Sequence, residues 1–420
     1  MASIQKPKGT LDILPQDMPA WRFIEDAARE QCRLFGFGEI RFPTFESTDL
    51  FCRGVGKSTD VVQKEMYTFI DKDGASLSLR PEGTACIARS VIENGLYAGT
   101  MPLKLFYFTN FFRRERPQAG RSREFWQFGT ELYGSEKPEA DATVIALADG
   151  FLKRIGLSGV ELKINTVGCE KCRPAYRQAL KEYFAQYEDK LCDTCRQRLE
   201  TNPLRILDCK CPDCIAIAEN APRTVDYVCD DCKSKFDSLL SLLGEMGVKY
   251  TADPKVVRGL DYYSGAVFEF IAGGIGAQSA VAGGGRYDGL TDQIGGHKLP
   301  AVGFAMGVTR LIACLKNEGL MPEDSAGPDI YIAPLGERAA RFAQLTANKL
   351  RQNGISAETD ICGRSLKAQM KYADKQKARY VLVVGDDELD QSSASLRDMR
   401  GDNVIKTDLS IQNIINIIGQ

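Results

Sequence analysis

The chain has 420 residues, of which 44% are hydrophobic and 26% are charged, and its formal net charge is −2. This length predicts more than one domain with well-packed cores, and the mixed composition argues against long disordered segments. No apolar run approaches the roughly 20 residues that span a bilayer, and the N-terminal sequence lacks the apolar segment of a signal peptide. We therefore expect a cytoplasmic protein without membrane contact.

The numbers of cysteines and histidines limit the kinds of reaction and metal site that the chain can contain. The chain contains 14 cysteines, which in a large intracellular protein are more often free thiols or metal ligands than disulfides. It contains one histidine. A mechanism that uses a histidine base, or a metal site with several histidines, is therefore all but excluded.

The first 168 residues predict an antiparallel sheet with helices. Residues 17–36 have the apolar spacing of an amphipathic helix that ends at a glycine. A second helix is expected at 138–155, and a strand at 161–167 follows it. Alternation of aromatic or β-branched with polar residues predicts further strands at 39–45, 65–71, 76–81, 103–115 and 123–134.

The segment RGVGKST at 53–59 ends like a phosphate-binding P-loop. That motif needs a glycine five positions before Gly56, where this chain has Phe51, and no apolar strand leads into the segment. We therefore expect a basic surface loop and not a nucleotide site.

Residues 169–250 read as an inserted helical region that is interrupted by paired cysteines. Two-residue spacing lets both thiolates of a pair face one ion, and two pairs complete a tetrahedral site. We predict structural zinc here, although reduced thiols without metal or redox-active pairs would have the same spacing. Which pairs combine is not fixed by the sequence, and Cys209 is a ninth cysteine outside the pairs. The predicted ligands are Cys169, Cys172, Cys192, Cys195, Cys211, Cys214, Cys229 and Cys232.

Strand-like sequence resumes after the insertion at 263–271, 280–290 and 301–315, the last of which runs into a helix that carries Arg310. The polar stretch at 321–328 has the composition of a linker. The remaining residues alternate strands with helices, which predicts a small α/β domain with a mainly parallel sheet. The predicted boundaries are 1–168 and 251–322 for the main domain, 169–250 for the insertion and 328–420 for the C-terminal domain.

Positive charge is concentrated in FRRERPQAGRSREFWQFGTELYG at 112–134. Guanidinium groups such as Arg113 suit phosphate oxygens, and Phe125 is placed to stack on a nucleobase. The alternative is a solvated hairpin in which arginine and glutamate pair with each other. Arg258 and Arg310 also lie beside glycine or aromatic residues, which permit close approach of a ligand. Together the three arginines predict a clamp for a polyphosphate.

These stretches resemble the class II aminoacyl-tRNA synthetases, and in particular the histidyl-tRNA synthetase family. The three class II motifs are similar to GFGEIRFPTFE at 36–46, to the segment at 112–134 and to VGFAMGVTRL at 302–311. Three further stretches are typical of this one family: LRPEGT at 79–84, RGLDYY at 258–263 and AGGGRYDGL at 282–290. The resemblance implies an α+β protein, with an antiparallel-sheet catalytic core, a helical insertion that contacts the tRNA acceptor arm, and a C-terminal α/β anticodon-binding domain. It also implies a homodimer with Pro43 in the dimer strand.

The resemblance assigns roles to individual residues. Arg113 and Arg258 would hold the α-phosphate of ATP from two sides, and Arg258 would do work usually left to a metal ion. Phe125 would stack on adenine, Arg310 would bind the far end of the triphosphate with Arg121 nearby, and Mg²⁺ would accompany the nucleotide. The substrate histidine would be bound by Glu82, Thr84, Gln127, Glu131, Arg258, Tyr262, Tyr263 and Tyr287.

The implied activity is that of a histidine–tRNA ligase, which joins L-histidine to ATP as histidyl-adenylate and then passes the histidyl group to the 3′ end of its tRNA. One alternative is a catalytically inactive paralogue that acts as a regulatory subunit of ATP phosphoribosyltransferase. Such chains usually lack the C-terminal domain and lose clamp arginines, and this chain keeps both. A zinc-dependent nucleic-acid-binding module, the third hypothesis, leaves RGLDYY and the glycine-rich strands without a purpose.

Overall fold

The aromatic stretches on either side of the arginine-rich segment form two ten-residue strands, β5 (Leu103–Phe112) and β6 (Glu124–Tyr133). They pair antiparallel along their whole length, from Leu103 opposite Tyr133 to Phe112 opposite Glu124. Because successive side chains of a strand point to opposite faces, this hairpin presents aromatic rings to both sides of the sheet.

The structure is a computed structural model that describes residues 3–57, 59–117, 120–273, 280–322, 327–401 and 403–419. Ser58, residues 118 and 119 between the predicted strands at 103–115 and 123–134, and the centre of the predicted linker at 321–328 lie outside the described residues. The chain forms two compact units, residues 1–322 and 323–420.

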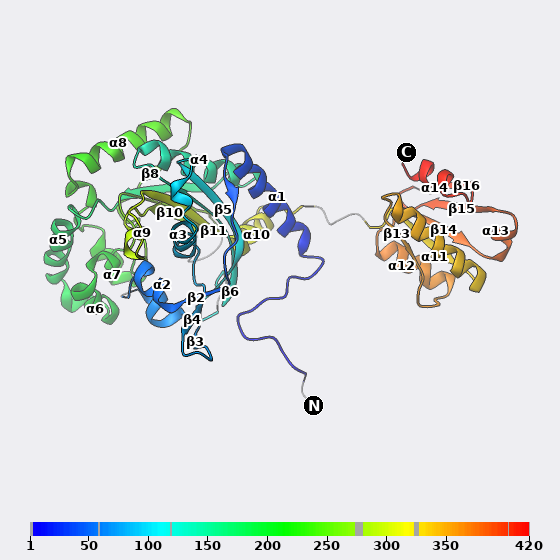
Figure 1. Ribbon diagram of the computed structural model, residues 1–420, viewed down its shortest axis with the longest axis horizontal. Helices are drawn as coiled ribbons and strands as arrows, with labels where there is room; N and C mark the ends of the chain where they lie inside the picture. The colour runs from blue at the N-terminus through cyan, green and yellow to red at the C-terminus, as the bar shows by residue number, and fades with distance from the viewer. Residues whose placement is uncertain are drawn as a thin grey trace. The chain divides into compact units, whose positions relative to one another are not determined.

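The first unit is organised around one eight-stranded sheet, most of whose neighbouring strands are antiparallel (Figure 1). Only the outermost pairs, β1 with β5 and β7 with β8, are parallel among the described strands of this sheet. The predicted antiparallel core is thereby confirmed. In spatial order the strands are β1 (Gly38–Glu39), β5, β6, β11 (Ala301–Gly307), β10 (Ala280–Arg286), β9 (Ala266–Ile271), β7 (Glu161–Thr166) and β8 (Thr251–Ala252).

The two faces of this sheet differ in chemistry. One face is covered by a large apolar core that includes Phe128, Phe151 and Phe304, all of them buried. The helices on this face are α1 (Met18–Phe35), α4 (Pro138–Arg154), α8 (Asp230–Glu245) and α10 (Val308–Asn317). The other face carries α3 (Thr84–Glu93) and α9 (Leu290–Gln293) and a core rich in tyrosine hydroxyls. The second face therefore combines burial with polar groups, as a ligand site requires.

The predicted strand at 39–45 is broken in the structure. Only its ends are strands, β1 and β2 (Phe45–Ser47), and β2 belongs to a small sheet with β4 (Ser76–Leu79) and β3 (Thr68–Ile70), next to α2 (Thr48–Phe51). Pro43 cannot donate a ladder hydrogen bond. The guanidinium of Arg80 instead donates to the carbonyls of Phe42 and Pro43, at 2.8 and 3.1 Å, and holds the extended segment.

The insertion has its own core, formed by α5 (Arg173–Ala185), α6 (Asp193–Thr201) and α7 (Pro212–Ala218), which lie together at one side of the unit in Figure 1. The next helix, α8, packs on α4 instead, and its Leu239 and Leu243 are buried in the core of the main sheet. The helical part of 169–250 is therefore anchored to the catalytic core at its C-terminal end.

The second unit contains a five-stranded mixed sheet. Strand β12 (Ile330–Pro334) is parallel to β13 (Ala357–Thr359) and β14 (Tyr380–Val384), whereas β14, β15 (Ser393–Asp398) and β16 (Val404–Asp408) are antiparallel. Helices α11 (Glu337–Gln352) and α14 (Ile411–Ile418) pack in the main core of this unit, α12 (Leu366–Lys375) in a smaller one, and the short α13 (Asp386–Asp390) follows β14. The sheet is thus only half parallel, because the last two strands fold back as a hairpin.

Among the described helices, none combines the length and the apolar character that crossing a membrane requires.

Candidate functional site

One cavity on the tyrosine-bearing side of the molecule brings together the predicted polyphosphate clamp. The arginines reach it from the end of β5, the loop before β6, the segment before β9 and the first turn of α10. In the sequence these arginines are separated by up to about 200 residues. The predicted residues that line this cavity are Arg113, Arg121, Phe125, Gln127, Arg258 and Arg310.

Each arginine is oriented by a local contact. Arg113 donates from Nε to the carbonyl of Pro81 at 2.9 Å, and its guanidinium carbon lies 5.4 Å from the centre of the Phe125 ring. Arg310 donates to the carbonyl of Ala280 at 2.6 Å and to that of Gly120 at 3.2 Å. Fixed guanidinium groups around one cavity form a preorganised anion site.

The positive charges in this cavity affect one another. Burial lowers the pKa of Arg310, and the nearby charges of Arg121 and Arg113 lower it further, whereas Glu115 and Glu269 act in the opposite direction. Arginine nevertheless stays protonated at neutral pH. The cavity thus concentrates positive charge that a polyanion would neutralise.

Two buried carboxylates lie beside this cavity, on β6 and just before α3. Glu131 is 1% exposed; the Thr84 hydroxyl donates to its Oε1 at 2.8 Å and the Tyr287 hydroxyl donates to its Oε2. Glu82 accepts from the backbone N–H groups of Ala85 at 2.7 Å and Thr84 at 3.0 Å. Burial raises the pKa of both carboxyls, that of Glu131 to about 8, although the hydrogen bonds act against this rise.

The predicted tyrosines are buried in one cluster with these two carboxylates. The Tyr262 hydroxyl lies 3.4 Å from Glu82 Oε2, and its ring centre lies 4.7 Å from that of Tyr263 and 5.6 Å from that of Tyr287. Arg258 lies between the arginine cavity and this buried cluster, because it lines the cavity and its guanidinium carbon lies 5.7 Å from the Tyr263 ring centre. Its Nε is buried without a hydrogen-bond partner among the described residues.

Sequence reasoning missed three residues at the site. Glu115 forms an ion pair with Arg121 at 2.8 Å, and Glu269 pairs with Arg258. Tyr107 is buried beside Gly83 and Gly129, and its hydroxyl has no partner among the described residues. Glu269 is a single acid within the apolar strand AVFEFI, which is the kind of signal that would have identified it.

The segment at 53–59 is not the surface loop that its sequence suggests. Val55 and Thr59 are fully buried, and the carbonyl of Val55 accepts from the backbone N–H of Asp261 at 3.3 Å. The described part of this segment therefore packs against the RGLDYY stretch. It lines no part of the arginine cavity.

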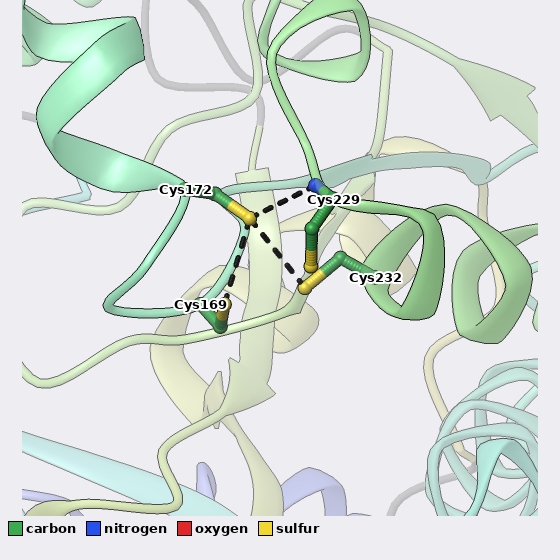
Figure 2. Close-up of side chains that lie close together, drawn as sticks. All are labelled: Cys169, Cys172, Cys229 and Cys232. Atoms are coloured by element: carbon green, nitrogen blue, oxygen red, sulfur yellow. Dashed lines mark hydrogen bonds between the residues drawn. The ribbon is translucent and has the colours of Figure 1, made fainter.

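The cysteines of the insertion form two separate groups of four. In the first, Cys169, Cys172, Cys229 and Cys232 converge from the start of α5 and the start of α8 (Figure 2). Their sulfur atoms lie within 4.8 Å of one another, and the backbone N–H of Cys229 donates to Cys172 Sγ at 3.1 Å. Burial acts to raise the pKa of Cys169, but hydrogen bonds, chiefly from Cys172, outweigh it and lower the pKa to about 7.

The second group corrects one predicted ligand. It contains Cys192, Cys195, Cys209 and Cys214, so Cys209 takes the place predicted for Cys211. Cys211 begins helix α7, and its backbone N–H donates to Cys209 Sγ at 3.4 Å. Its own thiol is therefore outside the group while its amide supports it. Counting Cys-x-x-Cys pairs could not reveal this exchange, because it depends on the turn before α7.

Comparison with known proteins identifies the family of this chain. The family described as histidyl-tRNA synthetase matches residues 9–311, and the family described as anticodon binding domain matches residues 329–420. The chain belongs to the histidyl-tRNA synthetase family. The family, the fold class and the histidine–tRNA ligase activity predicted from the sequence are thereby confirmed.

Similar proteins cover the whole chain. The histidine–tRNA ligase of Thermoanaerobacter pseudethanolicus is 51% identical over 413 residues, which are 98% of this chain and 99% of that protein. That of Caldanaerobacter subterraneus is 49% identical over 393 residues, 94% of each chain. Among solved structures, apo histidyl-tRNA synthetase of S. aureus is 35% identical, covers 100% of both chains and has a TM-score of 0.84.

A more distant structure bears on the alternative hypothesis. A protein of Bacillus halodurans, described as an ATP phosphoribosyltransferase regulatory subunit/histidyl-tRNA synthetase, is 25% identical with a TM-score of 0.67 and covers 92% of this chain and 99% of its own. The ligases above match at about twice that identity.

Proposed function

We propose that the arginine cavity binds ATP and that the adjoining buried cluster of Glu82, Glu131 and the tyrosines binds L-histidine. The observation that carries this proposal is the convergence of Arg113, Arg258 and Arg310 on one cavity. Gln127 and Arg258 lie where the two ligands would meet. A carboxylate placed there is held against the α-phosphate, and such positioning is a large part of adenylation catalysis.

Adenylate formation needs charge stabilisation and no histidine base. A carboxylate oxygen of the substrate bonds to the α-phosphorus, the bond to the β-phosphate oxygen breaks, and pyrophosphate leaves. Negative charge that builds on the α-phosphate oxygens is stabilised by Arg113 and Arg258, while Arg310 and Arg121 bind the leaving end. Mg²⁺, when bound with the nucleotide, would neutralise further phosphate charge.

Glu131 supplies the specificity of the amino-acid pocket. Its buried carboxylate would accept the N–H of the substrate imidazole, and Glu82 with Thr84 would hold the substrate amino group. A side chain without this donor leaves a buried carboxylate unpaired, which is a strong basis for rejection. Tyr262, Tyr263 and Tyr287 enclose the ring.

The second step transfers the histidyl group to the 3′-terminal ribose of the tRNA for histidine. We assign catalysis to residues 1–168 and 251–322, contact with the acceptor arm to the insertion at 169–250, and anticodon binding to residues 328–420. The match of residues 329–420 to an anticodon binding domain supports the last assignment. Unstacked anticodon bases are suited to sequence-specific recognition.

Both cysteine groups fit structural zinc. A zinc ion with four thiolate ligands at about 2.3 Å places the sulfur atoms about 3.8 Å apart. The sulfur atoms of Cys169 and Cys172 are 3.5 Å apart, those of Cys172 and Cys232 3.8 Å, and those of Cys192 and Cys209 3.8 Å. Zinc here would fold the insertion and take no part in the reaction.

We also propose a cytoplasmic homodimer. The small sheet that follows the Pro43 segment exposes Phe45, Phe69 and Ile70, which are 53%, 43% and 67% accessible. Exposed apolar side chains on one small sheet are typical of an interface. Reducing conditions in the cytoplasm would keep the cysteines as thiols or metal ligands.

Histidine-dependent exchange of labelled pyrophosphate into ATP tests the proposal. The chain should catalyse this exchange without tRNA, Arg258→Ala should reduce its rate at least about a hundredfold, and Arg223→Ala, a change within the insertion surface, should leave it unaltered. A chain that shows no exchange, but activates an ATP phosphoribosyltransferase catalytic subunit, would establish the regulatory alternative instead.

A further inference from the structure

The insertion contacts the catalytic core at two carboxylates that the reaction does not use. Arg205, in the turn Pro203–Ile206, lies 3.1 Å from Asp60 Oδ2 through its Nη2, and Arg198 lies 3.7 Å from the same oxygen. Asn202 donates from Nδ2 to Asp261 Oδ1 at 3.4 Å. The arginine side chains are only 19% and 22% exposed, so these contacts are screened less than surface ion pairs.

Asp261 is the centre of the RGLDYY stretch, between Arg258 and Tyr263. Its carboxylate fits against Gly56, where an added Cβ would lie 2.5 Å from Asp261 Oδ2 and where φ is +104°. Only glycine allows both that approach and that backbone angle without strain. The glycine-rich segment at 53–59 thus packs against the loop at 258–263. Asp60, which follows this segment, forms the ion pairs with Arg198 and Arg205 of the insertion.

The same junction reaches the first cysteine group. Arg173 follows Cys172 directly and lies at this junction. A small cavity is lined by Arg173, Asn202 and Arg205 on the insertion side and by Arg258, Asp261 and Tyr263 on the loop side. The insertion and the loop that carries Arg258 therefore share one packed contact.

We propose that Asn202 and Arg205 are positioning residues for histidine activation: they hold the loop at 258–263 in the conformation that binds histidine. The insertion then contributes to the first step of the reaction, before any tRNA is bound. This inference rests on the proposed binding of histidine by Arg258, Tyr262 and Tyr263.

If the loop at 258–263 adopts its histidine-binding conformation only part of the time, the kinetic constants change in a characteristic way. If the competent conformation is populated to a fraction f, the apparent dissociation constant rises by 1/f, while saturating histidine restores the competent state. Loss of the contact therefore raises KM for histidine and changes kcat little. A merely structural defect lowers the amount of active enzyme, so kcat falls and KM stays constant.

The test is tRNA-free pyrophosphate exchange with the full chain and varied histidine. Arg205→Ala and Asn202→Ala should each raise KM for histidine about two- to thirtyfold, and Arg205→Lys should recover part of the loss because it keeps the charge near Asp60. The double variant Asp60→Asn with Arg205→Ala should have a KM for histidine only slightly higher than that of either single variant. Arg223→Ala, whose partner is Asp226 within the insertion at 3.2 Å, is the matched control.

Thermal unfolding and active-site titration of each variant show whether it is folded. Unchanged KM for histidine in folded Arg205→Ala, Asn202→Ala and the double variant would overturn the inference, as would a defect confined to the tRNA-dependent step. Failure of the proposed function looks different, because the unaltered chain would then show no histidine-dependent exchange at all.

Discussion

The Thr84 hydroxyl donates a 2.8 Å hydrogen bond to Glu131 Oε1, which joins the first residue of α3 to the C-terminal part of β6. The Tyr287 hydroxyl, which follows β10, donates to the other oxygen of the same carboxylate. Three distant segments thus fix one buried acceptor. Both oxygens are oriented before a ligand arrives, which lowers the cost of binding an imidazole N–H.

Glu131→Gln should weaken histidine activation selectively. The amide cannot accept from Thr84 and Tyr287 through both of its terminal atoms, so one of these two buried hydroxyl donors loses its acceptor. A buried polar group left without its partner costs about 1–3 kcal/mol, so kcat/KM for histidine should fall about 5- to 150-fold while KM for ATP stays nearly constant. Pyrophosphate exchange measures both. Glu161→Gln, at an exposed position on β7, is the control. If Glu131→Gln lowered kcat/KM equally for histidine and for ATP, the result would contradict the assignment.

The same carboxyl should make stability depend on pH. Burial raises its pKa from 4.5 to about 8 in the folded state. A raised folded-state pKa means that the carboxyl contributes fully to stability below pH 4.5 and that this contribution is lost as pH rises towards 8. Relative to Glu131→Gln, the free energy of unfolding of the unaltered chain should therefore fall by a few kcal/mol, as an order of magnitude, between pH 5 and 8. Urea unfolding of both proteins across this range measures the difference, and parallel pH curves would show that the carboxyl is ionised when folded.

The variants Cys209→Ser and Cys211→Ser should differ in zinc content and in thermal stability. Cys209 belongs to the second cysteine group and Cys211 does not. Cys209→Ser should therefore lower bound zinc from two ions to one per chain and reduce the thermal stability of the insertion, whereas Cys211→Ser should change neither. Elemental analysis of protein purified without chelator gives the stoichiometry. Equal zinc content in both variants, or none in the unaltered chain, would refute the assignment.

The main features of the site could be predicted from the sequence because they depend on residue chemistry and strand alternation. Phe125 lies on β6 and Arg113 directly follows its partner strand β5, so a hairpin was enough to place them together. Contacts between distant loops could not be predicted. The segment at 53–59 reads as a surface loop because its partner, Asp261, is about 200 residues away, and Cys209 replaces Cys211 through the geometry of one turn. Likewise, the Pro43 segment is held by the Arg80 side chain, which no periodicity reveals.

Gly303→Ala should abolish histidine activation, because Gly303 on β11 is the cross-strand partner of Glu131 on β6. A Cβ at Gly303 would lie 1.8 Å from Glu131 Oε2 and 2.4 Å from the carbonyl of Thr130. The backbone of β6 cannot move away without breaking its pairing with β5 and β11, so the carboxylate must leave its hydrogen bonds to Thr84 and Tyr287. Overpacking of this kind costs about 1–3 kcal/mol, and exchange activity should fall further than stability does. Gly244→Ala is the matched control, since its Cβ would meet nothing within 4 Å in helix α8 and alanine favours helix by about 1 kcal/mol. If Gly303→Ala kept normal exchange kinetics, Glu131 could not be the acceptor for the substrate ring.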